Sequence, residues 1–370
     1  MLEKKIPVIL DGDPGHDDAI AWTLAASSPL LDILAVTTVA GNVTLDKTTL
    51  NSRKIWTMLG QEVVIAQGAA KPLFTEHIDA PSVHGESGLD GPALPDPEIE
   101  LHELGAVDLM AQLLREAEEP ITIVPTGPLT NVATLLLTYP ELKEKIARIC
   151  FMGGGAAYGN WTPAAEFNIL VDPEAAHVVF HAGLPLTMCG LDVTEKALVQ
   201  PEDIERMRQI KNPVAQIVAE WLDFFYLFHK EKGYPGAPVH DAVAVIALTN
   251  PEILTKKTCF VDVELTGDYC RGETVVDRYG VWGQEANVDL VFDIERENFV
   301  DLICSALESY GDLWDVRWRK NCVCIAAKST DTTHSNPYCT NFRRKHGTSL
   351  YRYRTPQDVC RARATRERNR

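Results

Sequence analysis

Three features are scarce or missing in this sequence of 370 residues, and each absence excludes a class of protein. No apolar run approaches the roughly 18 to 20 residues that a membrane-spanning helix needs. The nine cysteines include no Cys-x-x-Cys pair, which fits a reducing compartment better than a disulfide framework. Basic residues are outnumbered, 35 Lys and Arg against 52 Asp and Glu. Nucleic acid and anionic membranes are therefore not expected as partners.

The N-terminal segment MLEKKIPVILDGD runs directly into an apolar stretch, which leaves no room for a signal peptide. We therefore expect a cytoplasmic location. Apolar residues make up 45% of the chain, enough for a sizeable core. The formal net charge of −17 says little about a small neutral substrate.

Apolar strand-like runs alternate with helical segments along residues 1–310. Strands are expected at 6–11, 32–41, from 121, and at 147–155, 185–192 and 260–267, with helices at 16–27, 45–59, 173–182 and 295–309 among them. This alternation predicts one α/β domain with a single open, mostly parallel, Rossmann-like sheet and helices on both faces. A ligand site is then expected at the C-terminal ends of the strands.

The last sixty residues have a different composition. Residues 311–370 carry 14 Lys and Arg against 5 Asp and Glu, a net of +9, so residues 1–310 carry −26. The segment contains six potential zinc ligands, but their spacings match no standard finger: Cys322, Cys324, His334, Cys339, His346 and Cys360. A basic arm for nucleic acid is the other alternative. We expect a basic, disordered or non-native extension, for example one produced by a shifted reading frame.

The first candidate site is an acidic cluster that follows the first strand. Asp11, Asp13, Asp17 and Asp18 lie within eight residues. A helix cap would account for one or two of them. Four crowded carboxylates repel one another unless a cation lies among them, and hard oxygen ligands suit calcium or magnesium. The cluster therefore predicts a divalent metal site.

Three further segments carry polar side chains at comparable positions. Val239-His240-Asp241 precedes an apolar helix, and HGESGLDG (84–91) is a glycine-rich loop that begins with His84. The segment GNWTPAAEFNILVDPEAA (159–176) interleaves polar and aromatic side chains: Asn160, Trp161, Glu166, Phe167 and Asn168. Hydrogen-bonding groups flanked by aromatic rings suit a sugar or a nucleoside, although each residue alone is unremarkable.

These motifs occur together in a known order. DGDPGHDDA, VTTVAGN, HGESGLDGP, VPTGPLTN, MGGG, GNWTPAAEFNILVDPEAA and PVHD resemble the inosine–uridine-preferring nucleoside hydrolase family in order and spacing across residues 6–310. HGESGLDGP and GNWTPAAEFN are most similar to the bacterial pyrimidine-specific ribonucleoside hydrolases. The resemblance implies water-dependent cleavage of a ribonucleoside into ribose and free base.

The resemblance also implies a role for each matching residue. A calcium ion would be held by Asp13, Asp18, the carbonyl of Thr126 and Asp241, and Asp13 would be the base that activates water. Three residues would hold the 2′ and 3′ hydroxyls, namely Asp17, Asn42 and Asn168. Asn160 and Glu166 would hold the 5′ hydroxyl. His240 would act on the leaving base as acid or orienting group, with His84 as its neighbour, and Asp11 would hold the loop.

The base that is released is less closely specified. The segment 221–241 is expected to form a helix and a mobile loop over the base, where Phe228, His229 and Tyr234 are candidate contacts. Uridine and cytidine are favoured, with inosine and other purine nucleosides as the alternative. Relatives are usually homotetramers or homodimers, so a homo-oligomer is expected.

Two other classes compete with this hypothesis. A binding protein that retains the pocket would not need the water-activating set of Asp13, Asp18, His240 and Asp241. A metal-dependent phosphohydrolase would need a nucleophilic Asp followed by Gly-Thr and a downstream Lys, whereas the loop here reads DPGHDD.

Overall fold

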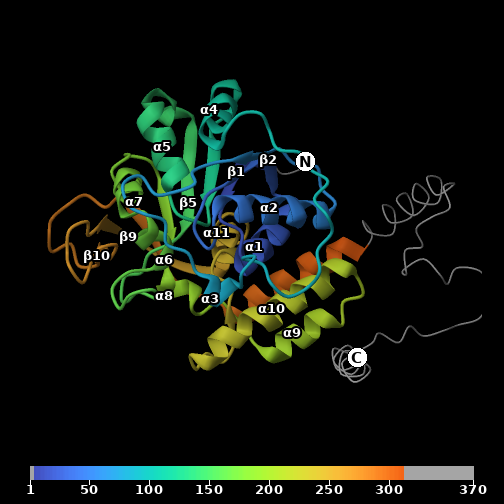
Figure 1. The fold of residues 1–370 in the computed structure, drawn as a ribbon. Coiled ribbons are helices and arrows are strands. Elements are labelled where there is room, and N and C mark those ends of the chain that lie inside the picture. The colour runs from blue at the N-terminus through green and yellow to red at the C-terminus, as the bar shows by residue number, and fades with distance from the viewer. Residues whose placement is uncertain (1–3, 312–370) are drawn as a thin grey trace, which may run out of the picture. The chain divides into compact units, whose positions relative to one another are not determined.

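The computed structural model describes residues 4–311, and a nine-stranded sheet runs through this part of the chain (Figure 1). The strands follow the order β10-β9-β11-β6-β5-β4-β1-β2-β3. Their bounds are β1 Ile6–Gly12, β2 Leu31–Thr38, β3 Ile65–Gln67, β4 Ile121–Pro125, β5 Ile146–Met152, β6 Leu186–Cys189, β9 Leu254–Val263, β10 Thr274–Asp277 and β11 Val288–Ile294. All neighbouring pairs are parallel except those that involve β9. The predicted mostly parallel α/β sheet is confirmed.

Helices cover both faces of this sheet. One face packs against α1 His16–Ser27, α2 Leu45–Leu59, α9 Pro201–Arg208, α10 Pro213–Glu231, α11 Ala242–Thr249 and a helix at 296–311. The other packs against α4 Ala106–Glu116, α5 Thr130–Thr138 and α7 Pro173–Phe180. Figure 1 shows α4 and α5 on the opposite side of the strands from α1 and α10.

Strand β1 is covered by helices on both faces of the sheet. Val8 and Leu10 belong to the cluster under α1 and α11, whereas Ile9 belongs to the cluster under α5. Successive side chains of a strand point to opposite faces, so a strand covered on both sides is an unbroken apolar run. The buried run ends where the chain leaves the sheet, at the acidic residues that follow.

Several short elements lie near the carboxyl ends of the strands: α3 Pro81–His84, α6 Phe167–Val171, α8 Leu191–Thr194, and a separate two-stranded sheet of β7 Leu198–Val199 and β8 Ala237–Pro238. Two 3-10 segments, Pro140–Lys145 and Pro251–Ile253, lead into β5 and β9. Loops and very short helices leave backbone groups free, so this edge of the sheet is where polar side chains can converge.

Some predicted boundaries were wrong. The strand expected at 260–267 spans Leu254–Val263 and pairs antiparallel with β11. Its first half contains the exposed residues Lys256 and Lys257, which are tolerated near the sheet edge and hide the strand from an apolar pattern. The strand expected at 32–41 ends at Thr38, where the chain turns toward the site. The tail with its cysteines and histidines lies outside the described residues. Within residues 4–311, no helix combines the length and apolarity that a bilayer crossing requires.

Candidate active site

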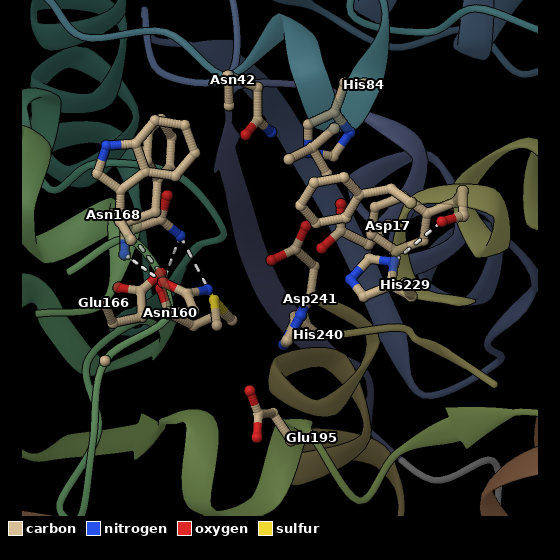
Figure 2. Close-up of a pocket in the computed structure, with 18 of the residues that line it drawn as sticks. Asp17, Asn42, His84, Asn160, Glu166, Asn168, Glu195, His229, His240 and Asp241 are labelled. Atoms are coloured by element: carbon tan, nitrogen blue, oxygen red, sulfur yellow. Dashed lines mark hydrogen bonds between the residues drawn. The ribbon is translucent and has the colours of Figure 1, made fainter. Parts of the chain in front are cut away.

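A pocket of about 400 Å³ opens at the carboxyl ends of the parallel strands, as predicted from the fold class. Its lining comes from segments far apart in the sequence, and ten of these residues are labelled in Figure 2. In Figure 2, Asn160, Glu166 and Asn168 lie on one side, His84 and His229 lie on the other, and Asp17 and Asp241 lie between them. The pocket thus has a polar amide wall, an acidic floor and a histidine wall.

The acidic floor is built from three carboxylates. Asp17 and Asp18 are in the first turn of α1, and Asp241 immediately precedes α11, which packs beside α1. One oxygen of each lies within 4.8 Å of the others, and all three side chains are buried. Burial, reinforced by the neighbouring charge of Asp18, raises the pKa of Asp17 to about 8. Burial also raises the pKa of Asp18 to about 6. Such a cluster needs a counter-charge.

The donor set fits a hard divalent cation. The buried oxygens Oδ1 of Asp13 and Oδ1 of Asp17 have no hydrogen-bond partner within the described part of the chain. No Lys or Arg among residues 4–311 forms an ion pair with these carboxylates. Unpartnered buried carboxylate oxygens are costly, and an oxygen-only set of this kind suits calcium or magnesium. The structure thus provides an acidic site that a metal ion can occupy.

Asp13 lies next to this cluster and is held rigidly. Its Oδ2 accepts a hydrogen bond from the backbone N–H of Asn42 at 2.6 Å. Gly41 and Gly127 press against the carboxylate, and a Cβ on either glycine would collide with it. Burial, followed by repulsion from Asp18, holds the pKa of Asp13 well above its usual range. The carboxylate therefore has one anchored oxygen and one free oxygen.

Asp11 has a different environment. Its Oδ1 accepts hydrogen bonds from the Thr37 hydroxyl at 2.6 Å and from the Asn131 amide at 2.8 Å. It does not line the pocket. These contacts tie β1 to β2 and α5 and support the structural role expected for this residue.

Thr126 and Asn168 connect the acidic floor to the amide wall. The Thr126 hydroxyl donates to Oδ1 of Asp18 at 2.6 Å, and the Thr126 carbonyl accepts from Nδ2 of Asn168 at 2.9 Å. Nδ2 of Asn168 also reaches the Met152 carbonyl at 3.3 Å. The amide nitrogen of Asn168 is thereby occupied, which leaves its oxygen as an acceptor for a ligand hydroxyl.

Asn42, Asn160 and Glu166 are anchored in the same way. Nδ2 of Asn42 donates to the Asp13 carbonyl at 3.2 Å, and Oδ1 of Asn160 accepts from the Phe167 N–H at 3.0 Å. Glu166 caps α6, and its two oxygens accept from three backbone N–H groups at 2.8 to 3.1 Å. Burial, opposed by these donors, raises the pKa of Glu166 to about 7. Asn42 thereby keeps its amide oxygen free and Asn160 its amide nitrogen, whereas both oxygens of Glu166 are already engaged by the backbone and hold the carboxylate in a fixed position.

On the histidine wall, His84 is oriented by His16, a residue that the sequence analysis did not single out. Nε2 of His16 lies 2.7 Å from the Asp90 carbonyl, which can only accept, so this nitrogen carries the proton. Burial lowers the pKa of His16 to about 4, and Nδ1 of its neutral ring lies 3.2 Å from Nδ1 of His84. The His16 backbone N–H also donates to Nδ1 of His84, at 3.4 Å, so two contacts from His16 fix the orientation of the His84 ring.

His240 and His229 complete this wall. Nδ1 of His240 lies 2.8 Å from the Thr194 hydroxyl, and Nδ1 of His229 lies 2.9 Å from the Phe225 carbonyl. Burial, then the neighbouring His229, lowers the pKa of His240 to about 3. His240 is therefore neutral near pH 7. Of the two roles expected for His240, the neutral state favours the orienting, hydrogen-bonding group over the general acid.

Glu195, Tyr158 and Tyr234 close one end of the pocket. The Tyr234 hydroxyl donates to Oε1 of Glu195 at 2.6 Å, and the Tyr158 hydroxyl donates to Oε2 at 2.7 Å. The sequence analysis chose Tyr234 but missed Glu195 and Thr194. Both residues follow β6, so the rule that sites form at strand exits could have found them.

The fold, the acidic floor and the amide wall define an α/β protein with a metal-type site in a polar ligand pocket, and comparison with known proteins gives the family. The model of the inosine-uridine preferring nucleoside hydrolase family matches residues 8–301. The chain belongs to this family and is an enzyme that hydrolyses ribonucleosides. It is 55% identical over 307 residues to the pyrimidine-specific ribonucleoside hydrolase RihA of Shewanella woodyi, covering 82% of this chain and 98% of that one. The corresponding Photobacterium profundum protein is 53% identical over 307 residues, covering 82% and 99%.

Solved structures show the same fold. The purine-preferring ribonucleoside hydrolase from Gardnerella vaginalis superposes with a TM-score of 0.77 at 27% identity, covering 82% of this chain and 98% of that chain. A plant nucleoside hydrolase gives a TM-score of 0.76 at 30% identity, covering 82% and 99%. The predicted family and reaction class are therefore confirmed, whereas the individual site roles stay predictions.

Proposed function

We propose that this enzyme hydrolyses the N-glycosidic bond of uridine and cytidine with calcium as its metal ion. The observation that carries the proposal is the cluster of Asp17, Asp18 and Asp241 at the floor of a pocket whose side wall offers oriented amide and carboxylate functions. The pyrimidine preference is supported by identities of 53 to 55% to relatives named pyrimidine-specific, against 27% to the purine-preferring structure.

Asp13, Asp18, Asp241 and the Thr126 carbonyl would hold the ion, with Asp17 beside it. A bound calcium ion supplies a Lewis-acidic centre that makes water more acidic and attracts vicinal hydroxyls. Asp13 takes the proton from the attacking water through its free Oδ1, since its Oδ2 is anchored on Asn42. The surrounding carboxylates stabilise the positive charge that develops on the sugar as the glycosidic bond breaks.

The ribose is positioned by groups that are already oriented. Asp17, Asn42 and Asn168 would bind the 2′ and 3′ hydroxyls, and Asn160 with Glu166 would bind the 5′ hydroxyl. In Asn42 and Asn168 the amide nitrogen is bound to the protein, so the oxygen is available to accept. In Asn160 the oxygen is bound, so its amide nitrogen can donate. Because these groups are oriented before the substrate binds, the entropic part of the activation barrier is lower.

The leaving base would lie against the histidine wall and the aromatic residues of α10 that pack on it. His240 presents Nε2 to the pocket because Nδ1 is engaged by Thr194. It would hydrogen-bond the base as negative charge develops there. His84 lies beside it, while His229 and Tyr234 enclose the far end.

Substitution of Glu195 tests the enclosure of the base. We expect Glu195→Ala to raise KM about tenfold with a smaller effect on kcat, because two hydrogen bonds to a charged group are lost and both tyrosines are released. Steady-state kinetics on uridine measures this split. Tyr234→Phe is the matched variant, since it removes one of the two bonds, and should give an intermediate KM. Wild-type KM in both variants would contradict the enclosing role.

A substrate panel tests the proposed function directly. Release of free base and reducing sugar is measured for uridine, cytidine, inosine, adenosine and thymidine with calcium present. We expect uridine and cytidine to exceed inosine in kcat/KM by at least about tenfold, since the base pocket contributes discrimination of a few kcal/mol. Faster cleavage of inosine would favour the purine-directed alternative. Tight binding without base release would favour a binding protein.

The assembly is a separate part of the proposal. A homodimer or homotetramer is expected from the resemblance, and several large apolar side chains are exposed, including Phe74, Tyr269, Tyr279 and Val281. Light scattering on the purified full chain measures the state. The cytoplasmic location likewise stays a prediction from the sequence.

A further inference from the structure

A second group of metal-type ligands lies outside the pocket described above. His177 and His181 belong to α7 and its C-terminal cap, and Asp262 belongs to β9. One ligand atom from each residue lies within 4.8 Å of the others, and none of the three lines the pocket. We propose that these three side chains form a surface site for a divalent transition ion such as zinc.

The two histidines are spaced for joint coordination. Residues four apart lie on the same face of a helix, and a His pair with this spacing is a common bidentate metal ligand. The helical hydrogen bond from the His181 N–H to the His177 carbonyl, at 3.1 Å, keeps the chain helical through His181. The ring centroids are 4.2 Å apart, so both rings project to the same side.

The donor atoms of these rings converge on one carboxylate. Nδ1 of His177 lies 3.0 Å from Oδ1 of Asp262, and Nε2 of His181 lies 3.6 Å from Oδ2. Around a tetrahedral zinc ion with bonds of about 2.0–2.2 Å, neighbouring ligand atoms lie about 3.3–3.6 Å apart. The observed separations of 3.0 and 3.6 Å, each to a different oxygen of Asp262, are of this size.

Hydrogen bonds to the backbone orient two of the three ligands, His181 and Asp262. Nδ1 of His181 lies 2.9 Å from the His177 carbonyl, which can only accept, so Nδ1 donates there and Nε2 is the ring nitrogen that faces Asp262. A metal-binding histidine commonly donates its other N–H to a carbonyl in this way. Oδ1 of Asp262 is held by the Val263 N–H at 2.8 Å. At His177 the ion would replace the proton now shared with Asp262.

A simple hydrogen-bonded His–Asp pair would need only one of the two histidines, whereas here nitrogens of both His177 and His181 face the Asp262 carboxylate. The histidine side chains are 41% and 46% exposed, which gives an ion access and leaves room for water ligands. Imidazole donors favour zinc, nickel or copper over calcium, so this site and the all-oxygen floor of the pocket would select different ions. A bound ion would link α7 to β9 and stabilise the folded state.

The test uses the calcium-saturated full chain and Co²⁺ as a spectroscopic probe for zinc. We expect one Co²⁺ to bind with visible bands of nitrogen and oxygen coordination and without a thiolate charge-transfer band, which separates this site from cysteine ligands. His181→Ala and Asp262→Asn should weaken this binding by at least about tenfold. His102→Ala and Asp268→Asn are matched controls at exposed positions and should bind as the wild type does.

Zn²⁺ should also raise the melting temperature of the wild type and of both controls, but not of the two site variants. Calcium-dependent base release verifies that every variant is folded, since none of these residues contacts the pocket. Superimposable titrations of the wild type and the site variants would overturn the proposal. A spectrum that shows only thiolate coordination would overturn it as well.

Discussion

Asp13→Asn is expected to reduce kcat by about 10²–10⁴-fold or more, to the point where turnover is lost, because an amide cannot take the proton of the attacking water. The replacement has nearly the same shape and can still accept the Asn42 N–H. Gly41 and Gly127 leave no space for the side chain to move aside. The measurement is single-turnover release of uracil from uridine with calcium at saturation.

Two comparisons separate lost chemistry from lost structure. Asp13→Asn removes a charge that repels Asp18 and Asp17, so the metal-free variant should melt no lower than the wild type. His240→Ala should slow the reaction by about 10–100-fold, a smaller loss, because a neutral histidine contributes a hydrogen bond to the leaving base. If Asp13→Asn turns over at the wild-type rate with calcium bound, Asp13 is not the base.

Exhaustive chelation is expected to abolish base release and to destabilise the protein in a pH-dependent manner. A ligand present at about 100 times its Kd contributes about 2.7 kcal/mol to the free energy of unfolding. The pKa values of Asp17 and Asp18 in the folded, metal-free chain are raised to about 8 and about 6. The folded state therefore holds protons that the unfolded state has released, and its stability falls as pH rises from about 4 to about 8.

A bound cation offsets this loss of stability at high pH because its charge balances that of the ionised carboxylates. The gain in melting temperature on adding calcium should thus be larger at pH 8 than at pH 5, as measured by calorimetry in EDTA and in excess calcium. Asp241→Asn serves as the matched variant, since it removes one ligand of the cluster and should reduce both the calcium-dependent gain and the activity. A calcium effect that does not change with pH, or full activity in chelator, would contradict the assigned site.

Much of the fold could be predicted because its signals are local. The apolar run of β1 is buried on both faces, and α1 and α2 begin and end where the residue pattern indicated. The exit of β1 into DGDPGHDD placed a metal-type cluster at the carboxyl edge of a parallel sheet, since that is where strand exits meet. Strand β9 was misplaced because exposed charged residues near a sheet edge do not show the apolar pattern of a buried strand.

Local sequence signals could not predict which carboxylates face one another. Neighbouring residues of a helix point about 100° apart, so the directions of Asp17 and Asp18 depend on how α1 sits against the sheet and α11. The packing of α1 on α11 brings both of them to Asp241, whereas Asp13 lies beside the group with one free oxygen.

The sequence by itself determined the family, the class of reaction and the residue types of the site, because these follow from short motifs and their order. Tertiary structure alone decided the long-range partnerships. Glu195 joins Tyr158 to Tyr234, His16 sets the orientation of His84, and two histidines of α7 share one carboxylate of β9. Each of these contacts depends on how separate elements pack, and packing is set by the whole core and not by the residues beside each side chain.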